Sequence, residues 1–539
     1  MPNSNEKIKR LMELSAPLAG AFILNAVSDQ ATTYILSQSS TSTLATSGLS
    51  VLLYNPTINI GGSALAALPV LISKYYGEGN QEDSISTLVK QGWVLSGILA
   101  IPQAIILGLA NPILSLLQQP DKLIKISSNY FYLSIASLPA VNTLLASKGF
   151  AYGTGKMRVI IALNAFNLIV GSMLLYGFML GPFGLPKNDF DGYAYAITTQ
   201  AWLNTLFLAG FLKRYGLMEN YNFFTFKTHN FNDLAKKFLK IGSAVALKTT
   251  IAFTSTIYKQ VLIGKAGEIS INAYQVVNTY NGYIAYINDA TNLATNTLIG
   301  ESFGKKDFSL LSQYYKLGLC TSVGVATLFA IPSLSIPEQM TRVFFTVDKA
   351  DEQDFINQIF YISAAQSILD AISQTLIGAF LWTENAATPV LLPFINFLLV
   401  TLPITMGLYY GTDLGTLGIA TGYLIGSLTQ TLAVMVAWNR KLHHIKNELE
   451  TTVDIAESLQ NEVPMQPLLT EGKKSTYDAL SGTKENHDNS REKFTDLDVK
   501  SQKYFGTNYL TTFSSSSTQN IILNQDATSS KQKTYTTSF

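Results

Sequence analysis

The sequence predicts an all-α integral membrane protein with twelve transmembrane helices, arranged as two related six-helix bundles. Three observations support this prediction: an apolar composition, twelve apolar segments of bilayer length, and a repeat relating the two halves of the chain. Of the 539 residues, 47% are hydrophobic and only 14% are charged, and the mean hydropathy is +0.21. Because soluble proteins carry about 25% charged residues, this composition indicates a membrane protein. The net charge of +1 gives no reason to expect a nucleic-acid partner.

The apolar segments fall into two groups of six, each segment being long enough to cross a bilayer as a helix. They lie near residues 12–37, 43–75, 86–117, 122–148, 158–181 and 190–212, and near 236–262, 268–300, 309–333, 353–382, 386–410 and 414–439. The first segment follows basic residues, as in a signal peptide, but continues to Leu36 without a clear cleavage site, so we interpret it as an uncleaved span. The predicted regions are therefore an N-terminus (1–11), a first bundle (12–215), a linker (216–235), a second bundle (236–445) and a tail (446–539).

Two short motifs repeat between the halves. Leu71-Ile-Ser-Lys-Tyr-Tyr-Gly77 returns as Leu298-Ile-Gly-Glu-Ser-Phe-Gly304, and Asp191-Gly-Tyr-Ala-Tyr-Ala196 resembles Leu417-Gly-Ile-Ala-Thr-Gly422. Each half contains an even number of spans, so both halves have the same orientation across the membrane. Two related bundles around a central site are typical of transporters.

The placement of lysine and arginine predicts the orientation. Loops on the side of the N-terminus carry many basic residues, such as Arg10, Lys156 and Lys305, whereas the opposite loops carry few. Cytoplasmic loops are enriched in lysine and arginine. We therefore expect a multi-pass protein of the cell membrane with both termini in the cytoplasm.

The composition changes abruptly near Asn447. The remaining residues are rich in serine, threonine, asparagine and charged side chains, and they cannot bury enough apolar surface to fold alone. We expect a disordered cytoplasmic tail. Binding of an unknown cytoplasmic partner by this tail is kept as an alternative to a tail without a function of its own.

The positions of the four histidines argue against an enzyme. None of the four histidines lies in an apolar segment, and Cys320 cannot form an intrachain disulfide. Histidine-based catalysis or metal binding inside the membrane is therefore nearly excluded. We expect no metal and no cofactor, and a membrane-embedded acyltransferase lacks its acid–base residues here.

A carboxyl group lies well inside the first span. Asn25, Asp29 and Thr33 are four residues apart and share one helix face. Burying a charge at this depth costs roughly 2.5–3.5 kcal/mol on insertion scales, so this face must line a cavity or contact another helix. Desolvation without a cationic partner favours the protonated form of a carboxyl group. Asp29 is therefore a candidate for proton exchange; the alternative is a permanently protonated, hydrogen-bonded aspartic acid.

The second bundle contains one deep cation, Lys248, as well as carboxylates. Lys248 and Asp289 lie at similar depths in neighbouring, antiparallel spans, so we predict an ion pair between them. The pair is either structural or opens during transport. Lys259 lies eleven residues beyond Lys248, and we expect its side chain to reach the outer interface.

Polar side chains form stripes along two spans of the second bundle. Asp370 lies between Gln366 and Gln374, and an earlier span carries Gln275, Asn278 and Asn281. Such stripes form interhelical hydrogen bonds in some membrane proteins. We favour the alternative, a water-filled substrate cavity.

Several motifs resemble those of the multidrug and toxin extrusion (MATE) transporters. They are Pro17 and Asp29 in the first span, Tyr76-Gly77-Glu-Gly79, Gly153-Thr-Gly155-Lys156, Gly304-Lys-Lys-Asp307, and Asp370 eight residues before Gly378. Together with the twelve spans and the repeat, the resemblance covers about residues 8–445. The major facilitator family usually carries a basic Asp-Arg-x-Gly-Arg-Arg loop after its second span, which is absent here.

The resemblance implies an antiporter that exports organic, often cationic, compounds in exchange for inward protons or sodium ions. The ion-coupling aspartates of the family match Asp29 and Asp370, and its polar pair in the fifth span matches Asn164 and Asn167. The span 7 glutamate of some members falls at Ala252, which favours protons over sodium. With Asn25 and Thr33, the two asparagines and the second-bundle stripes complete the predicted substrate cavity. We expect a monomer whose partners are a small organic substrate and the bilayer.

Two further alternatives follow from the same sequence. A flippase for lipid-linked precursors, as in distant relatives of the family, would line its cavity with several cations, whereas only Lys248 lies deep. The other alternative treats the tail as the functional part and the bundles as its anchor.

Overall fold

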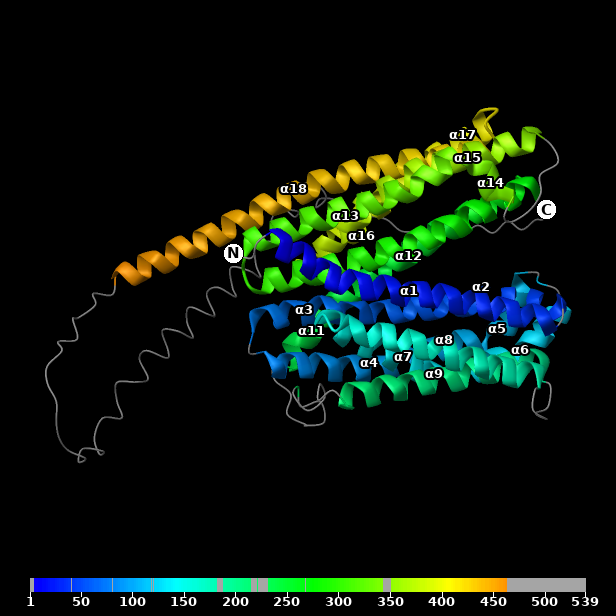
Figure 1. The fold of residues 1–539 in the computed structure, drawn as a ribbon, viewed down its shortest axis with the longest axis horizontal. Coiled ribbons are helices and arrows are strands. Elements are labelled where there is room, and N and C mark those ends of the chain that lie inside the picture. The colour runs from blue at the N-terminus through cyan, green and yellow to red at the C-terminus, as the bar shows by residue number, and fades with distance from the viewer. Residues whose placement is uncertain are drawn as a thin grey trace, which may run out of the picture. The chain divides into compact units, whose positions relative to one another are not determined.

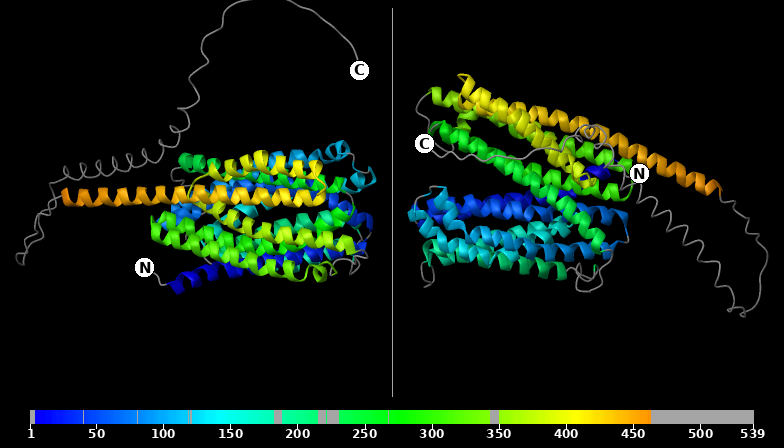
Figure 2. Two further views of the ribbon diagram at one scale, coloured as in Figure 1. Left: turned by 90° about the horizontal axis from the view of Figure 1, so that it is seen from above. Right: turned by 180° about the vertical axis from the view of Figure 1, so that it is seen from behind.

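The computed structural model describes residues 4–39, 41–79, 81–117, 119, 121–181, 188–214, 221, 231–266, 268–342 and 350–462. Every regular element among these residues is a helix, and the long helices run side by side (Figures 1 and 2). The fold has the predicted twelve transmembrane segments in two related six-helix bundles. Residues 1–460 pack as one compact unit, so the boundaries 12–215 and 236–445 stay a prediction about the repeats.

The first bundle follows the six predicted apolar segments. Its elements are α1 (Ser4–Ser39), α2 (Thr41–Ser63), the 3-10 turn η1 (Ala64–Ala66), α3 (Ala67–Glu78), α4 (Glu82–Gly108), α5 (Ala110–Leu116), α6 (Asp121–Ile135), α7 (Leu138–Gly153), α8 (Met157–Leu180) and α9 (Asp189–Arg214). Three of the predicted spans are therefore broken into shorter helices. In the fourth span the break covers residues 136–137, and Pro139 lies in the first turn of α7, where its missing backbone N–H costs no helical hydrogen bond.

The second bundle follows the last six segments. Its elements are α11 (Phe231–Lys265), α12 (Glu268–Gly304), α13 (Phe308–Ser335), α14 (Pro337–Arg342), α15 (Ala350–Trp382), α16 (Thr388–Asn396), the π-helical turn η3 (Phe397–Thr401), α17 (Leu402–Gly411) and α18 (Thr416–Glu462). Most of the predicted linker and the whole of residues 463–539 lie outside the described residues. The predicted tail starts too early, because α18 continues to Glu462. Glutamate is frequent after Lys446, and such residues extend a helix that has already formed.

Eight helical stretches of the described chain are long and apolar enough to cross a membrane. They lie in α1, α2–α3, α4, α8, α13, α15, α16–α17 and α18. Of the other four segments, α6–α7 is interrupted, and α9, α11 and α12 carry more polar residues. The polar residues of α11 and α12 belong to the site described below.

Buried apolar residues form three separate clusters. One cluster contains residues of both bundles, such as Leu71 on α3 and Leu298 on α12. The second cluster lies in the first bundle around Tyr130, and the third lies in the second bundle around Phe360. The shared cluster contains the start of α1 and the ends of α3, α9 and α12. The bundles therefore share a core at this end and have separate cores at the other.

We call the end with the shared core the basic end. It carries the lysines and arginines at the start of α1 and the ends of α3, α9 and α12, among them Lys7, Arg10, Lys74, Lys213 and Lys305. At this end Asp307 caps α13, its carboxylate accepting a hydrogen bond from the backbone amide of Leu310 at 2.9 Å. Gly155 has a φ of 70°, which explains the glycine in the turn between α7 and α8.

A buried asparagine fixes the packing of three helices in the second bundle. The side-chain oxygen of Asn292 on α12 accepts hydrogen bonds from Ser322 on α13 at 3.0 Å and from Thr375 on α15 at 2.5 Å. Removing a buried acceptor leaves its donors unsatisfied, which costs about 1–3 kcal/mol.

We expect Asn292→Ala to lower the free energy of unfolding by about 2 kcal/mol for this reason. Thermal unfolding of the purified protein in detergent would measure the change. Asn278→Ala is the matched control, because Asn278 is exposed on the same helix. Equal melting temperatures for the two variants would contradict this structural role.

Candidate functional site

Two helices from each bundle form a closed ring. α1 contacts α2, α2 contacts α11, α11 contacts α12, and α12 contacts α1. The predicted carboxyl group of the first span lies on a helix of this ring, and so do three ionisable residues named in the second bundle, Lys248, Lys259 and Asp289. The ring is therefore one part of the described fold in which helices of both bundles meet.

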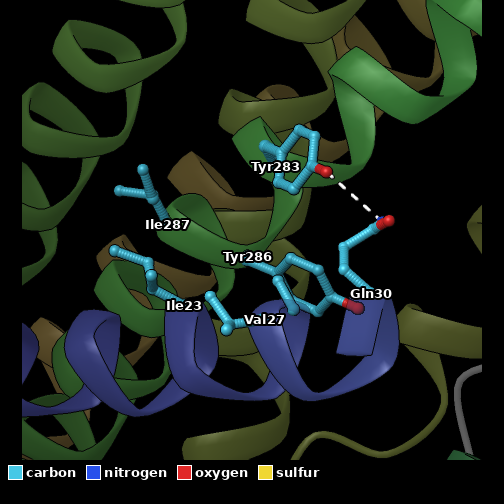
Figure 3. A pocket seen from close by; sticks show the side chains of 7 residues that line it. Ile23, Val27, Gln30, Tyr283, Tyr286 and Ile287 are labelled. Carbon is cyan, nitrogen blue, oxygen red and sulfur yellow. Dashed lines mark hydrogen bonds between the residues drawn. The ribbon is translucent and has the colours of Figure 1, made fainter. Parts of the chain in front are cut away.

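Asp29 on α1 contacts the second bundle. Its Oδ2 atom accepts a hydrogen bond from the hydroxyl of Tyr286 on α12 at 3.4 Å. One residue further on, the Gln30 side-chain amide donates to the hydroxyl of Tyr283 at 3.4 Å (Figure 3). The Asp29 side chain is exposed rather than enclosed in the first bundle. The carboxyl group is thus placed between the two bundles, where a movement of one against the other changes its surroundings.

A cavity of about 210 Å³ lies beside this contact, between α1 and α12. Figure 3 shows its apolar lining from Ile23, Val27 and Ile287, with the polar groups of Gln30 and the tyrosines nearby. Ligand pockets usually have volumes of about 300–1,000 Å³. This cavity is therefore large enough for one apolar or aromatic group of an organic compound, and not for a whole drug-sized molecule.

The tyrosines at this contact were not among the predicted site residues. The sequence contained a signal for them, since Tyr280, Tyr283 and Tyr286 recur every three residues in a span that already carried a polar stripe. Nothing in the sequence indicated that this stripe faces α1 of the other bundle.

Exposed polar side chains continue around the ring. They include Asn55 and Asn59 on α2, Thr250 and Thr254 on α11, and Gln275, Asn278 and Asp289 on α12. Polar groups in membrane-spanning segments rarely face lipid. The ring therefore has the polarity expected of a water-filled space between the bundles. Asn55 and Asn59 were missed by the sequence prediction, although their spacing of four places them on one helix face.

The predicted cavity residues of the first bundle hold helices together in this structure. The side-chain amide of Asn164 on α8 donates to the backbone oxygen of Ala21 on α1 at 2.8 Å. The oxygen of Asn167 accepts hydrogen bonds from Gln200 at 2.7 Å and Asn204 at 2.6 Å, both on α9. These bonds join α1, α8 and α9. Substrate contact by the two asparagines stays a prediction.

On α1 itself, Asn25 is half-buried and Thr33 is exposed. The Thr33 hydroxyl donates to the backbone oxygen of Asp29 at 3.0 Å, so it bonds to its own helix. Of the predicted α12 stripe, Gln275 and Asn278 are exposed and Asn281 is half-buried. These positions agree with a polar face on both helices, and their contact with a substrate is untested.

Asp370 on α15 lies in a hydrogen-bonded site within the second bundle. Its carboxylate accepts hydrogen bonds from the Ser427 hydroxyl on α18 at 2.8 Å and from the Gln366 amide at 3.3 Å. Gln366 was predicted, whereas Ser427 was not, because its distance along the chain gave no indication of the contact. Gln374, four residues beyond Asp370, is exposed.

Lys248 on α11 and Asp289 on α12 attract each other electrostatically. No direct ion pair joins them among the described residues. The predicted pair is therefore not closed in this structure and stays a prediction. Lys259 differs from its prediction more clearly, since its ammonium group lies over two tyrosine rings instead of reaching the outer interface.

The two bundles approach most closely where the repeated motifs end. A Cβ atom at Gly77 on α3 would overlap the backbone of Glu301 on α12, and one at Gly304 would overlap the backbone of Lys74. Gly77 and Gly304 are equivalent positions of the repeat, as are Lys74 and Glu301. The same contact is thus made twice, and the glycines allow backbone to meet backbone.

Charged side chains surround this contact at the basic end. Lys74 Nζ lies 2.8 Å from Glu384 Oε1 and 5.7 Å from the ring centroid of Phe303. Arg10 on α1 lies 3.6 Å from Glu301, and Lys7 contacts Gln313 on α13. Both bundles contribute to these pairs. Together with the shared core, they close the basic end in this structure.

Two related bundles, a polar ring between them and closure at one end only define a membrane transporter. Comparisons with known proteins agree with this class. The MatE family model matches residues 17–176 and 244–406, one stretch in each bundle. The chain therefore belongs to the MatE family.

Several relatives resemble this chain at low identity. A probable multidrug resistance protein NorM of Synechocystis sp. is 22% identical over 438 residues, covering 79% of this chain and 93% of the relative. A multidrug resistance protein NorM of Aliivibrio fischeri is 22% identical over 469 residues, covering 84% and 99%.

Solved structures share the fold. One is the outward-facing conformation of a multidrug resistance MATE family transporter, with a TM-score of 0.74 and 14% identity, covering 82% of this chain and 97% of that structure. Another is the eukaryotic MATE transporter AtDTX14, with a TM-score of 0.71 and 15% identity, covering 82% and 99%.

Proposed function

We propose that the protein is a secondary active antiporter that exports organic, often cationic, compounds in exchange for inward protons. The observation that carries this proposal is the position of Asp29, a carboxyl group on the polar ring between two bundles that share a core at one end only. The names of the NorM relatives support multidrug compounds as the substrate class.

The closed basic end corresponds to the cytoplasmic side in this proposal. Lysine and arginine concentrate on the cytoplasmic side of membrane proteins, and the basic end carries most of those that the structure describes. The substrate would therefore leave from the ring toward the opposite, outer side. Alternating access then requires the two bundles to separate at the shared core and to close against each other at the outer end.

Asp29 couples this movement to the proton in the proposed cycle. A proton entering from outside neutralises the carboxyl group, which no longer attracts a cationic compound, and the compound leaves. The contact with Tyr286 and the packing of α1 against α8 and α12 then rearrange. Release of the proton to the cytoplasm restores the charge and the attraction for the next substrate.

Proteoliposomes with the purified full-length protein test this function. Vesicles with an acidic lumen are expected to accumulate ethidium, because outward protons drive the cation inward through molecules of the matching orientation. A difference of one pH unit supports up to about tenfold accumulation in a one-to-one exchange. Valinomycin and potassium hold the membrane potential at zero, and protein-free vesicles give the leak.

A sodium gradient of the same size is the comparison. Accumulation driven by sodium and not by protons would show that sodium is the coupling ion, and the proposed export of organic cations would still stand. No accumulation with either gradient, for ethidium and for chemically different cations, would contradict the function itself.

A further inference from the structure

The ammonium group of Lys259 lies between two tyrosine rings. Lys259 is on α11, and its Nζ atom is 5.2 Å from the ring centroid of Tyr274 on α12 and 5.0 Å from that of Tyr423 on α18. Both distances are within the range of about 6 Å over which a ring face attracts a cation. Aromatic rings arranged in this way are also how proteins recognise alkylammonium ligands.

The two rings are held in place independently of the lysine. The Tyr423 hydroxyl donates to the backbone oxygen of Ser255 at 2.8 Å, and the Tyr274 hydroxyl donates to the backbone oxygen of Thr416 at 3.3 Å. Tyr274 is also almost fully buried, with 3% of its surface exposed. Removing the lysine side chain would therefore leave the rings in position.

A carboxylate adds negative charge to the same region. Asp370 on α15 attracts Lys259 electrostatically, and no direct ion pair joins them among the described residues. The Asp370 oxygens are instead bonded by Ser427 and Gln366. The ammonium group is thus held mainly by the rings, and the carboxylate provides the longer-range attraction.

A lysine with only a structural role could place its ammonium group at the interface at a lower free-energy cost. Lys259 lies six residues before the end of α11 at Lys265, and a lysine stem can extend along a helix toward the interface. The side chain instead turns inward to rings from two other helices. Its four-carbon stem and ammonium head have the chemistry of a primary alkylammonium ion.

We propose that Lys259 is a built-in ligand of an alkylammonium-binding site formed by the rings of Tyr274 and Tyr423. The side chain occupies this site, so a foreign organic cation binds there only by displacing it. Lys259 thereby sets the specificity of the second bundle against small alkylammonium compounds. The inference rests on the proposed function only in taking organic cations as the substrate class.

Equilibrium binding to the purified full-length protein tests this assignment. The probe is radiolabelled butyltrimethylammonium, which combines a four-carbon chain with a cationic head. Lys259→Ala is expected to bind the probe at least about tenfold more tightly than the wild-type protein, because two ring contacts become available. Tyr423→Leu in the Lys259→Ala background is expected to remove this gain.

Lys265→Ala is the matched control, since Lys265 is exposed at the end of the same helix and no ring contact is found for it among the described residues. Lys259→Gln provides a second variant that keeps most of the side-chain volume if the alanine variant unfolds. Unchanged affinity in both Lys259 variants, or an equal gain in Lys265→Ala, would overturn the proposal. The measurement uses no ion gradient, so its outcome is separate from that of the proton-coupling experiment.

Discussion

The Asp29→Asn variant is expected to lower the initial rate of proton-driven ethidium accumulation by at least about tenfold, which corresponds to about 1.4 kcal/mol. Asparagine has nearly the same shape as aspartate, and its side-chain oxygen can still accept the hydrogen bond from Tyr286. It cannot take up or release a proton. The substitution therefore removes the proposed coupling step with little change to the contact between α1 and α12.

The variant is expected to lose its response to the pH gradient. Ethidium is expected to equilibrate across the membrane or not to move at all, and in either case the pH gradient has no effect. Asp83→Asn, in the first turn of α4 away from the ring, is the matched control for the loss of one carboxylate. If accumulation by Asp29→Asn rises with the pH gradient as in the wild-type protein, another group couples transport to the proton. Asp370 is then the next carboxyl group to substitute.

The spans and the repeat could be predicted because they depend on local composition. A bilayer requires about twenty apolar residues of helix, and eight helical stretches of the described chain meet that requirement. The glycines of the repeat could also be seen in the sequence. The reason why glycine is needed there could not be seen, because the backbones of Gly77 and Glu301 come together only after two distant segments have packed.

The candidate site was predictable only in part. Asp29 and Asp370 were found because a carboxyl group inside an apolar segment is costly wherever its helix points. Partners on other helices, such as Tyr286 and Ser427, depend on which helix faces become neighbours. Lys259 was predicted wrongly for a related reason. A lysine near a helix end can reach the interface, and only the positions of two rings from α12 and α18 make the inward direction favourable.

The closed basic end leads to a second prediction with a large expected effect. Gly77→Leu and Gly304→Leu would each place a side chain against the backbone of the opposite bundle. Backbone atoms cannot move aside as a flexible side chain can, and overpacking of a tight interface costs about 1–3 kcal/mol or more. We therefore expect both variants to hold the basic end open and to lose most of their transport activity.

Thiol labelling can detect the opening directly. Cys320 is exposed, so Cys320→Ser provides the background, and Ser73→Cys introduces a fully buried thiol where α3 meets Gly300 of α12. In inverted membrane vesicles, whose cytoplasmic side faces outward, a membrane-impermeant maleimide is expected to label this thiol slowly. Adding Gly77→Leu or Gly304→Leu is expected to increase the labelling rate by about tenfold, matching a shift of about 1.4 kcal/mol toward the open state.

Gly210→Leu separates this effect from that of adding leucine to any helix of the bundle. Gly210 lies within α9, and a Cβ atom there meets nothing within 4 Å. Because Gly77 and Gly304 are equivalent in the repeat, their two variants should open the basic end to a similar extent, while Gly210→Leu should label like the background protein. Slow labelling and near-normal transport in both interface variants would mean that the glycine contact does not control access from this end. If only Gly77→Leu opens the basic end, the two equivalent glycine contacts do not contribute equally to closing it.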